Sequence, residues 1–210
     1  MKKPLQGKQF FRSLGSYLLI VFIPLSIICA FYIMHFYKAF RNEILTNVNK
    51  DLINISTRID TELSIFQNTA HQIEASNQLG ALSHEDDPVK INSAKSMLSN
   101  FSATNAFISE IFLTIPEMNY VLNSSTSNRI SYFTERYYEL EGLSPQQVKD
   151  FFTSATPKIL PSLTLHQFMF PEEKILLFSY PIYTDYLKQA GNVVFQVPLP
   201  NMEQLFNDKL

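Results

Sequence analysis

The feature that most constrains this chain is a stretch without formal charge from Ser13 to Tyr37, bounded by Arg12 and Lys38. As an α-helix, these 25 residues measure about 37 Å, more than the ~30 Å hydrocarbon core of a bilayer. A cleavable signal peptide has an apolar run of about 7–15 residues followed by small residues. Here the run is longer and leads into bulky aromatic side chains. We therefore expect an uncleaved transmembrane helix over residues 14–36.

The charges on the two sides of this segment are unequal. Residues 1–13 contain four basic side chains and no acidic one, whereas the rest of the chain has 13 basic and 19 acidic residues. The positive-inside rule then places the basic stub in the cytoplasm and the bulk of the chain outside, in a cell-membrane protein with a single span in this segment. The acidic excess argues against nucleic-acid binding by this segment itself. Because Cys29 is the single cysteine and lies in the apolar run, we expect an exported part without disulfides.

A long helix is predicted over residues 37–80, with apolar residues at every seventh position and Gly80 as its C-terminal cap. The membrane-proximal half, to about Ile59, has the spacing of a coiled-coil dimer seam. The seam positions are Leu45, Val48, Leu52 and Ile55. The pattern fails further on, where Glu62 and Thr69 take the apolar positions, so the distal half is expected to pack against its own domain. The alternative is a helix whose contacts are all intramolecular.

The remainder, residues 81–210, shows a mixture of helical and strand periods. Helices are predicted from Pro88, from Ser144, which begins a capping box, and over 201–210. Strands are predicted over 107–115, 120–122, 163–165, 175–183 and 192–197, with the first two forming a hairpin. This order predicts an α+β fold, in which helices pack on one side of an antiparallel sheet.

The sequence shows no residue pattern typical of an enzyme. It has no glycine-rich phosphate loop, no nucleophile motif and no His/Cys spacing for a metal. The four histidines, His35, His71, His84 and His166, are scattered. We therefore expect no enzymatic activity, no cofactor and no metal site.

Three segments carry a resemblance to a known family. "RSLGSYLLIVFIPLSIICAFYIMHFY" (Arg12–Tyr37) is similar to the N-terminal anchor of membrane-bound AraC-type transcriptional regulators of Firmicutes. "ILTNVNKDLINISTRIDTELSIFQNTAHQI" (Ile44–Ile73) resembles the first helix of their extracellular double Cache sensor, and "FSYPIYTDYLKQAGNVVFQVPL" (Phe178–Leu199) resembles its last two strands. The resemblance implies a PAS-like fold, with a transmembrane helix continuing into a long helix packed on an antiparallel sheet. Residues 81–210 would then be the membrane-distal half of a double Cache domain.

The chain departs from the family pattern in two respects. Cache domains that bind amino acids have an R-x-W-Y motif and an aspartate after the glycine of the last strand. Here Arg136-Tyr137-Tyr138 lacks the tryptophan, and Gln196 occupies the aspartate position. A double Cache regulator would also continue through a second module, a second span and a helix-turn-helix domain. The chain is therefore expected to be the N-terminal part of a larger receptor, which contacts DNA only through a later domain.

The resemblance also indicates where a ligand would bind. In a Cache-like fold, the connection that contains Arg129–Tyr138 covers the ligand-binding face of the sheet. Tyrosines combine an apolar ring with a hydroxyl, and arginine offers a planar fork of donors. The predicted ligand contacts are Arg136, Tyr138, Tyr180, Tyr183 and Asp185. The alternative is that these are ordinary surface and core residues.

Three functions are therefore open. The first is the sensory input region of a membrane-anchored AraC-type regulator, which senses a small extracellular solute such as a carbohydrate, or an envelope signal, and acts as a homodimer. The second is the same module on a histidine kinase, because input modules are shared between output types. The third is a membrane-anchored structural protein without a ligand.

Overall fold

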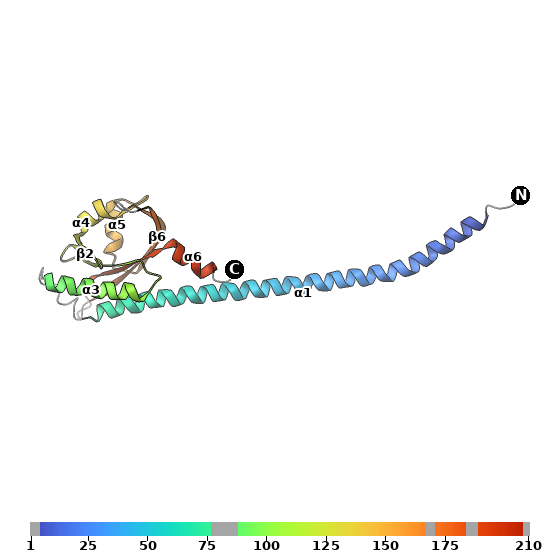
Figure 1. The fold of residues 1–210 in the computed structure, drawn as a ribbon, viewed down its shortest axis with the longest axis horizontal. Helices are drawn as coiled ribbons and strands as arrows, with labels where there is room; N and C mark the ends of the chain where they lie inside the picture. The colour runs from blue at the N-terminus through green and yellow to red at the C-terminus, as the bar shows by residue number, and fades with distance from the viewer. Residues whose placement is uncertain (1–4, 77–87, 167–170, 184–188, 208–210) are drawn as a thin grey trace. The chain divides into compact units, whose positions relative to one another are not determined.

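The computed structural model describes residues 5–76, 88–166, 171–183 and 189–207. The chain divides into two compact units, Met1–Ser56 and Thr57–Leu210. The helix α1 (Leu5–Glu74) has 70 residues and belongs to both units (Figure 1). It ends at Glu74, and the predicted cap Gly80 lies outside the described residues.

The first unit consists of α1 alone. Among the described residues, α1 is the one helix whose length and composition would allow it to cross a membrane, with a mean hydropathy of 2.5 in its most apolar window. Its apolar side chains from Leu14 to Ile53 are exposed in the isolated chain. Pro24 lies within the helix, a position tolerated more readily in lipid than in water.

The second unit is built around one antiparallel sheet of seven strands in the order β3-β2-β1-β7-β6-β5-β4. The strands are β1 (Glu110–Ile115), β2 (Tyr120–Leu122), β3 (Ser127–Arg129), β4 (Glu139–Leu140), β5 (Lys158–His166), β6 (Glu173–Tyr183) and β7 (Gln189–Pro198). The β1–β7 pairing joins the three-stranded and four-stranded halves of this sheet. The α+β architecture, with a long helix packed on an antiparallel sheet, is confirmed.

One face of the sheet packs against α1 and α3 (Pro88–Thr104). Phe66, Ala70 and Ile73 of α1 are buried there with Ala94 and Leu98 of α3. The ring of Phe66 lies 5.2 Å from that of Phe178 and 5.1 Å from that of Phe195, measured between centroids. The prediction that the distal half of the long helix packs on its own domain is therefore confirmed.

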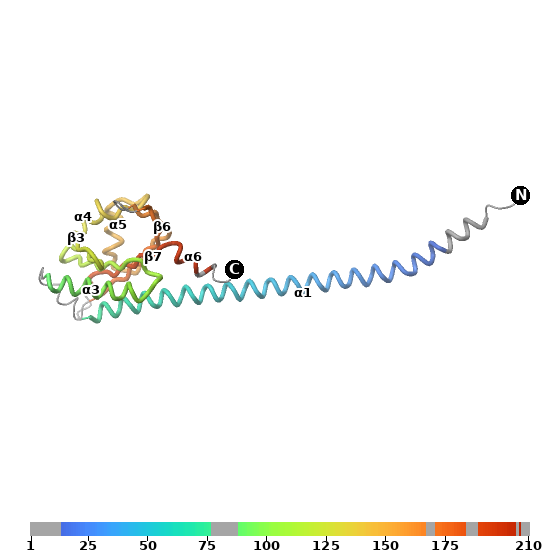
Figure 2. The backbone as a smooth tube through the Cα atoms, viewed as in Figure 1, coloured from blue at the N-terminus to red at the C-terminus, as the bar shows by residue number. Residues whose placement is uncertain are grey.

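The other face is covered as well, which the prediction of helices on one side missed. The chain leaves β3 and passes over this face as α4 (Ile130–Tyr132) and the π-helix η1 (Phe133–Tyr137). After β4 at the edge of the sheet, α5 (Pro145–Phe152) also covers this face (Figure 2). Ile130, Phe133, Val148 and Phe152 are buried against Phe112 of β1. The central strands β6 and β7 are apolar on both faces, so both faces must be buried.

Several local predictions are confirmed. Residues 116–119 turn β1 into β2, and Asn119 adopts a positive φ of 58°. The capping box of α5 is present, with Ser144 Oγ accepting from the Gln147 N–H and the Gln147 side chain accepting from the Ser144 N–H. The predicted strand 163–165 covers only part of β5. The first residues of β5 were missed because buried and exposed positions do not alternate there in the way that identifies a strand. The last helix, α6, spans Leu199–Asn207.

Candidate functional site

The connection after β3 is held in place at both ends. Arg129 has an extended backbone and precedes α4, whose first N–H, that of Ile130, donates to the Asn119 carbonyl at 2.9 Å. The Tyr138 N–H donates to the Phe133 carbonyl at 2.8 Å, five residues back, which is the bond of a π-turn. Thr134 is buried between them and its hydroxyl donates to the Ile130 carbonyl at 3.0 Å. Such π-turns frequently occur at functional sites.

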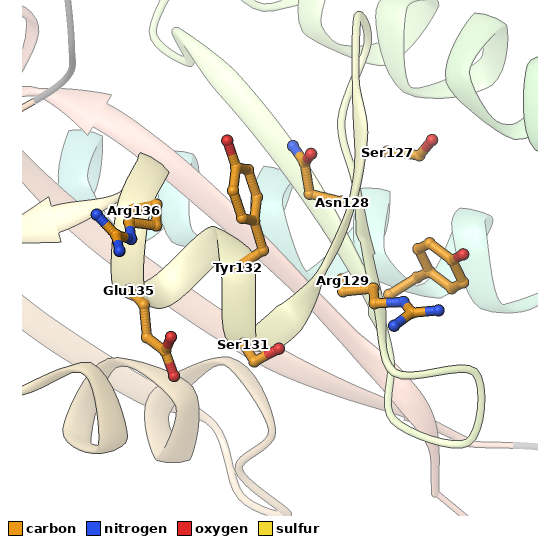
Figure 3. Close-up of a pocket in the computed structure, with 8 residues that line it drawn as sticks. Ser127, Asn128, Arg129, Ser131, Tyr132, Glu135 and Arg136 are labelled. Carbon is orange, nitrogen blue, oxygen red and sulfur yellow. The ribbon is translucent and has the colours of Figure 1, made fainter.

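The outer side of this connection forms an open cleft of about 600 Å³ against β2 and β3 (Figure 3). This volume is within the range of ligand pockets. We call it the arginine–tyrosine cleft. Its lining residues are Tyr120, Ser127, Asn128, Arg129, Ser131, Tyr132, Glu135 and Arg136.

The charged groups of the arginine–tyrosine cleft are separated from one another. Figure 3 shows Arg129 and Arg136 on opposite sides of Tyr132, with their guanidinium groups turned apart and the Glu135 carboxylate pointing away from both. In the part of the chain that the structure describes, no acidic side chain forms an ion pair with either arginine. Both guanidinium groups therefore keep their donors available to a ligand from solution.

The predicted contact Tyr138 lies in the core, whereas the neighbouring Arg136 lines the cleft. The Tyr138 ring is fully buried and packs at 4.9 Å from the ring of Phe133 and 5.3 Å from that of Phe112. Its hydroxyl donates to Gln196 Oε1 at 2.6 Å. Because the π-turn directs Tyr138 inward, the structure does not bring it together with Arg136.

The remaining predicted contacts lie elsewhere. Tyr180 belongs to the face that packs against α1, and its ring meets that of Phe195 edge-on at 5.9 Å. Tyr183, three residues later, points to the opposite face and its hydroxyl donates to the Ala155 carbonyl at 3.1 Å. Asp185 lies outside the described residues. The described members of the predicted set therefore do not converge on one space.

A polar group that the sequence did not indicate lies beside Tyr138. Glu110 of β1 is paired with Gln196 of β7 and accepts a hydrogen bond from the Ser124 hydroxyl at 3.0 Å. Burial raises the pKa of the Glu110 carboxyl, and the Ser124 hydrogen bonds oppose this only in part. Burial also raises the pKa of Tyr138, with smaller contributions from the negative charges of Glu110 and Glu173. The folded domain therefore favours the protonated form of Glu110.

We expect Glu110→Gln to stabilise the domain at neutral pH. Because the folded pKa is raised, the folded state binds this proton more tightly than the unfolded state does. The free energy of unfolding therefore falls as pH rises from the ordinary carboxyl pKa through the raised one. Glutamine keeps the acceptor for Ser124 without the charge. Thermal unfolding between pH 4 and pH 8 should show a stability gain that grows with pH.

The control for that measurement is Glu141→Gln, which removes a carboxylate from an exposed position. Its unfolding curve should follow that of the wild type at each pH. The measured quantity is the stability of Glu110→Gln minus that of the wild type. If this difference is smaller at pH 7 than at pH 4, the burial argument is wrong.

Of the residues that line the arginine–tyrosine cleft, Arg136 was a predicted contact, and Arg129, Ser131, Tyr132 and Glu135 belong to the predicted segment Arg129–Tyr138. Tyr120, Ser127 and Asn128 were not singled out from the sequence. A signal for the two arginines and Tyr132 is present in their spacing. Arg129, Tyr132 and Arg136 are separated by three and four residues, which places them on one side of a helix. Ile130, Phe133 and Thr134 then occupy the buried side.

A second polar hollow, of about 490 Å³, lies between α3 and the turn after β2. It is lined by serine and asparagine side chains, and its cation, Lys95, already donates to the Ser125 carbonyl at 3.3 Å. Within the described residues, no group of three His, Cys, Asp or Glu side chains could hold a metal ion. The arginine–tyrosine cleft therefore offers the stronger recognition chemistry.

Comparison with known proteins yields matches among solved structures. No protein-family model matches the chain, and no curated protein matches it in sequence. The chain is similar to the sensory domain of the Campylobacter jejuni chemoreceptor Tlp3 with isoleucine bound, at 15% identity over 74% of this chain and 59% of that one, with a TM-score of 0.48. It is also similar to the ligand-binding domain of the Pseudomonas aeruginosa amino-acid chemoreceptor PctC in complex with GABA, at 12% identity over 74% and 64%, with a TM-score of 0.48.

A third similar structure is the periplasmic sensory domain of the C. jejuni chemoreceptor Tlp1, at 12% identity over 77% of this chain and 66% of that one, with a TM-score of 0.39. The chain spans about three fifths of the length of the Tlp3 domain. The likeness concerns the general arrangement of a long helix and an antiparallel sheet. The ligands named for these chemoreceptors are properties of those proteins.

Proposed function

We propose that the chain is the extracytoplasmic sensory input region of a membrane-anchored transcriptional regulator, of the AraC type that its N-terminal segment resembles. The observation that carries the proposal is the continuity of α1. One helix contains both the apolar segment of membrane-spanning length and the residues Phe66, Ala70 and Ile73 buried against the sheet. A change in the sheet therefore acts directly on the helix that enters the membrane.

The arginine–tyrosine cleft is the proposed place of ligand binding. It is polar and exposed, and its floor is rigid because Ile130, Phe133 and Thr134 are buried beneath it. Its position after β3 matters for signalling, because β3, β2 and β1 form one half of the sheet and β1 also contacts α3. A ligand that contacts both β3 and η1 would shift this half of the sheet relative to the other.

The proposal has a defined orientation and output. In this proposal the basic stub lies in the cytoplasm and the domain outside, which the charge asymmetry supports. DNA would be contacted by a later domain of the full receptor. The sequence that follows this segment in the complete protein distinguishes an AraC-type output, with a helix-turn-helix pair, from a histidine kinase core.

Solute binding is tested by thermal unfolding of the full chain in detergent with a panel of amino acids, dicarboxylates, and neutral and acidic saccharides. We expect a binding solute at 100 times its Kd to add about 2.7 kcal/mol of stability and roughly 5 °C to the Tm. Tyr132→Ala should abolish the shift. Phe206→Ala removes an exposed aromatic ring from α6 and should preserve it. A protein for which no solute raises the Tm would favour the structural alternative.

A homodimer through the membrane-proximal part of α1 is a further part of the proposal. Leu45, Val48 and Leu52 are 51%, 48% and 59% exposed in the isolated chain, while Ile55 is half-buried. In a Cys29→Ser background, single cysteines along this seam should cross-link strongly under oxidation, whereas cysteines at Asn47 and Lys50 should cross-link weakly. A membrane-impermeant thiol reagent should label all of these positions in intact cells. Equal cross-linking on all sides of α1 would rule out the seam.

A further inference from the structure

We propose that the arginine–tyrosine cleft binds an elongated ligand that carries an acidic group at each end and a ring between them. This inference rests on the proposed function and specifies the chemistry of that same site. Two sources have the required chemistry, an oligosaccharide with a uronic acid at each end and an aromatic dicarboxylate.

The separation of the two cations determines the length of the ligand. Arg129 directly precedes α4 and Arg136 lies in η1, so the two arginines are seven residues apart in the chain. Figure 3 shows the guanidinium groups turned away from each other on either side of Tyr132. A single carboxylate therefore meets one arginine and leaves the other unsatisfied. A ligand that engages both must extend past Tyr132.

Each arginine is available for a bidentate hydrogen bond with a carboxylate. Both side chains are exposed, and no acidic partner occupies either of them among the described residues. The guanidinium fork matches the two oxygens of a carboxylate, which makes these hydrogen bonds about twice as strong as neutral ones. Planar acids are therefore favoured at both ends of the cleft.

The middle of the cleft has the surface that a ring requires. The Tyr132 side chain is 56% exposed and lies between the arginines. Beside it, Asn128, Ser127 and Ser131 present amide and hydroxyl groups. An exposed tyrosine ring stacks on a sugar or an aromatic ring, and neighbouring polar groups bond to substituents at its edge.

Glu135 limits how much negative charge the ligand carries. Its carboxylate lines the same cleft and reduces the formal charge of the lining from +2 to +1. The Glu135 carboxylate would repel a dense polyanion. A ligand with two separated acids instead has its charges next to the arginines. The charge pattern therefore favours a dianion over nucleic acid or polyphosphate.

The test is isothermal titration of the full chain in detergent with four probes. The diacids are a trisaccharide with a uronic acid at each end and a neutral sugar between them, and a biphenyl dicarboxylate. Their counterparts are a neutral trisaccharide and biphenyl monocarboxylate. At least one diacid should bind about tenfold or more tightly than its counterpart, because the saccharide gains two charged hydrogen-bonded pairs and the biphenyl dicarboxylate gains a second one. Which diacid binds identifies the source.

The variants separate this chemistry from a general effect of charge. Arg129→Gln and Arg136→Gln should each weaken diacid binding by about tenfold or more, whereas Lys158→Gln, which removes an exposed cation from β5, should change it by less than about twofold. The inference is overturned if neither diacid binds better than its counterpart, or if the arginine variants bind as the Lys158→Gln control does. If a neutral or monoacidic solute binds instead and Tyr132→Ala abolishes that binding, the ligand class is wrong and the proposed function stands. If the binding of no solute depends on Tyr132, both the inferred ligand class and the proposed function are wrong.

Discussion

Gly191→Ala is expected to lower the free energy of unfolding by about 3 kcal/mol or more, a larger effect than most single substitutions have. A Cβ on Gly191 would lie 1.9 Å from the carbonyl oxygen of Thr114, which is far inside contact distance. The obstructing atom belongs to the β1 backbone, so it cannot move without opening the pairing of β1 with β7. That pairing joins the two halves of the sheet. Denaturant unfolding of the full chain, followed by circular dichroism, measures the loss.

The matched control is Gly142→Ala. Gly142 has a positive φ of 79°, but no atom lies within 4 Å of an added Cβ. Its substitution therefore strains the local backbone without a collision and should cost about 1–2 kcal/mol. A Gly191→Ala variant no less stable than Gly142→Ala would show that β1 and β7 are not this close.

Tyr138→Ala is expected to cost about 3–5 kcal/mol, as truncation of a buried aromatic ring does. The ring contacts those of Phe112, Phe133 and Phe152, at centroid distances of 5.3, 4.9 and 5.7 Å. Tyr138→Phe keeps these contacts but leaves the Gln196 acceptor unpaired in the core, which should cost about 1–3 kcal/mol. In thermal and denaturant unfolding, the wild type should be the most stable of the three proteins, Tyr138→Phe should be less stable and Tyr138→Ala should be the least stable.

The comparison with Tyr132 separates a core role from a ligand-binding role. Tyr132→Ala at the exposed position should change stability by no more than about 0.5 kcal/mol. If Tyr138 contacted a ligand instead, Tyr138→Phe would alter solute binding while stability stayed at the wild-type value. That outcome would contradict the buried position of the ring.

Much of the fold was predictable because its signals are local. The alternation in β1, the serine and proline that begin α5, and the loss of the seven-residue pattern at Glu62 each depend on a few neighbouring residues. Burial on both faces of the sheet was not predicted. The apolar runs of β6 and β7 do not by themselves show which segment covers the second face. That cover is supplied by α4, η1 and α5, whose assignment depends on tertiary contacts.

The candidate site was predictable only in part, for a related reason. The segment Arg129–Tyr138 was recognised by its composition, but the inward and outward residues within it depend on the π-turn at Phe133–Tyr137. One additional residue in that turn moves Tyr138 into the core and leaves Arg136 outside. Tyr180 and Tyr183 were grouped although three residues along a strand point to opposite faces. The strand alternation was available from the sequence, whereas the π-turn was not.

Hydrogen–deuterium exchange of the full chain tests the central claim most directly. The exchange of backbone amides is compared with and without the solute that raises the Tm most in the panel. We predict that protection is concentrated in residues 127–137, the segment that contains most of the residues lining the arginine–tyrosine cleft, and that Tyr132→Ala removes it. Protection confined to the hollow lined by Lys95 and Ser125, or unchanged exchange over residues 127–137 in the presence of a bound solute, would contradict the account.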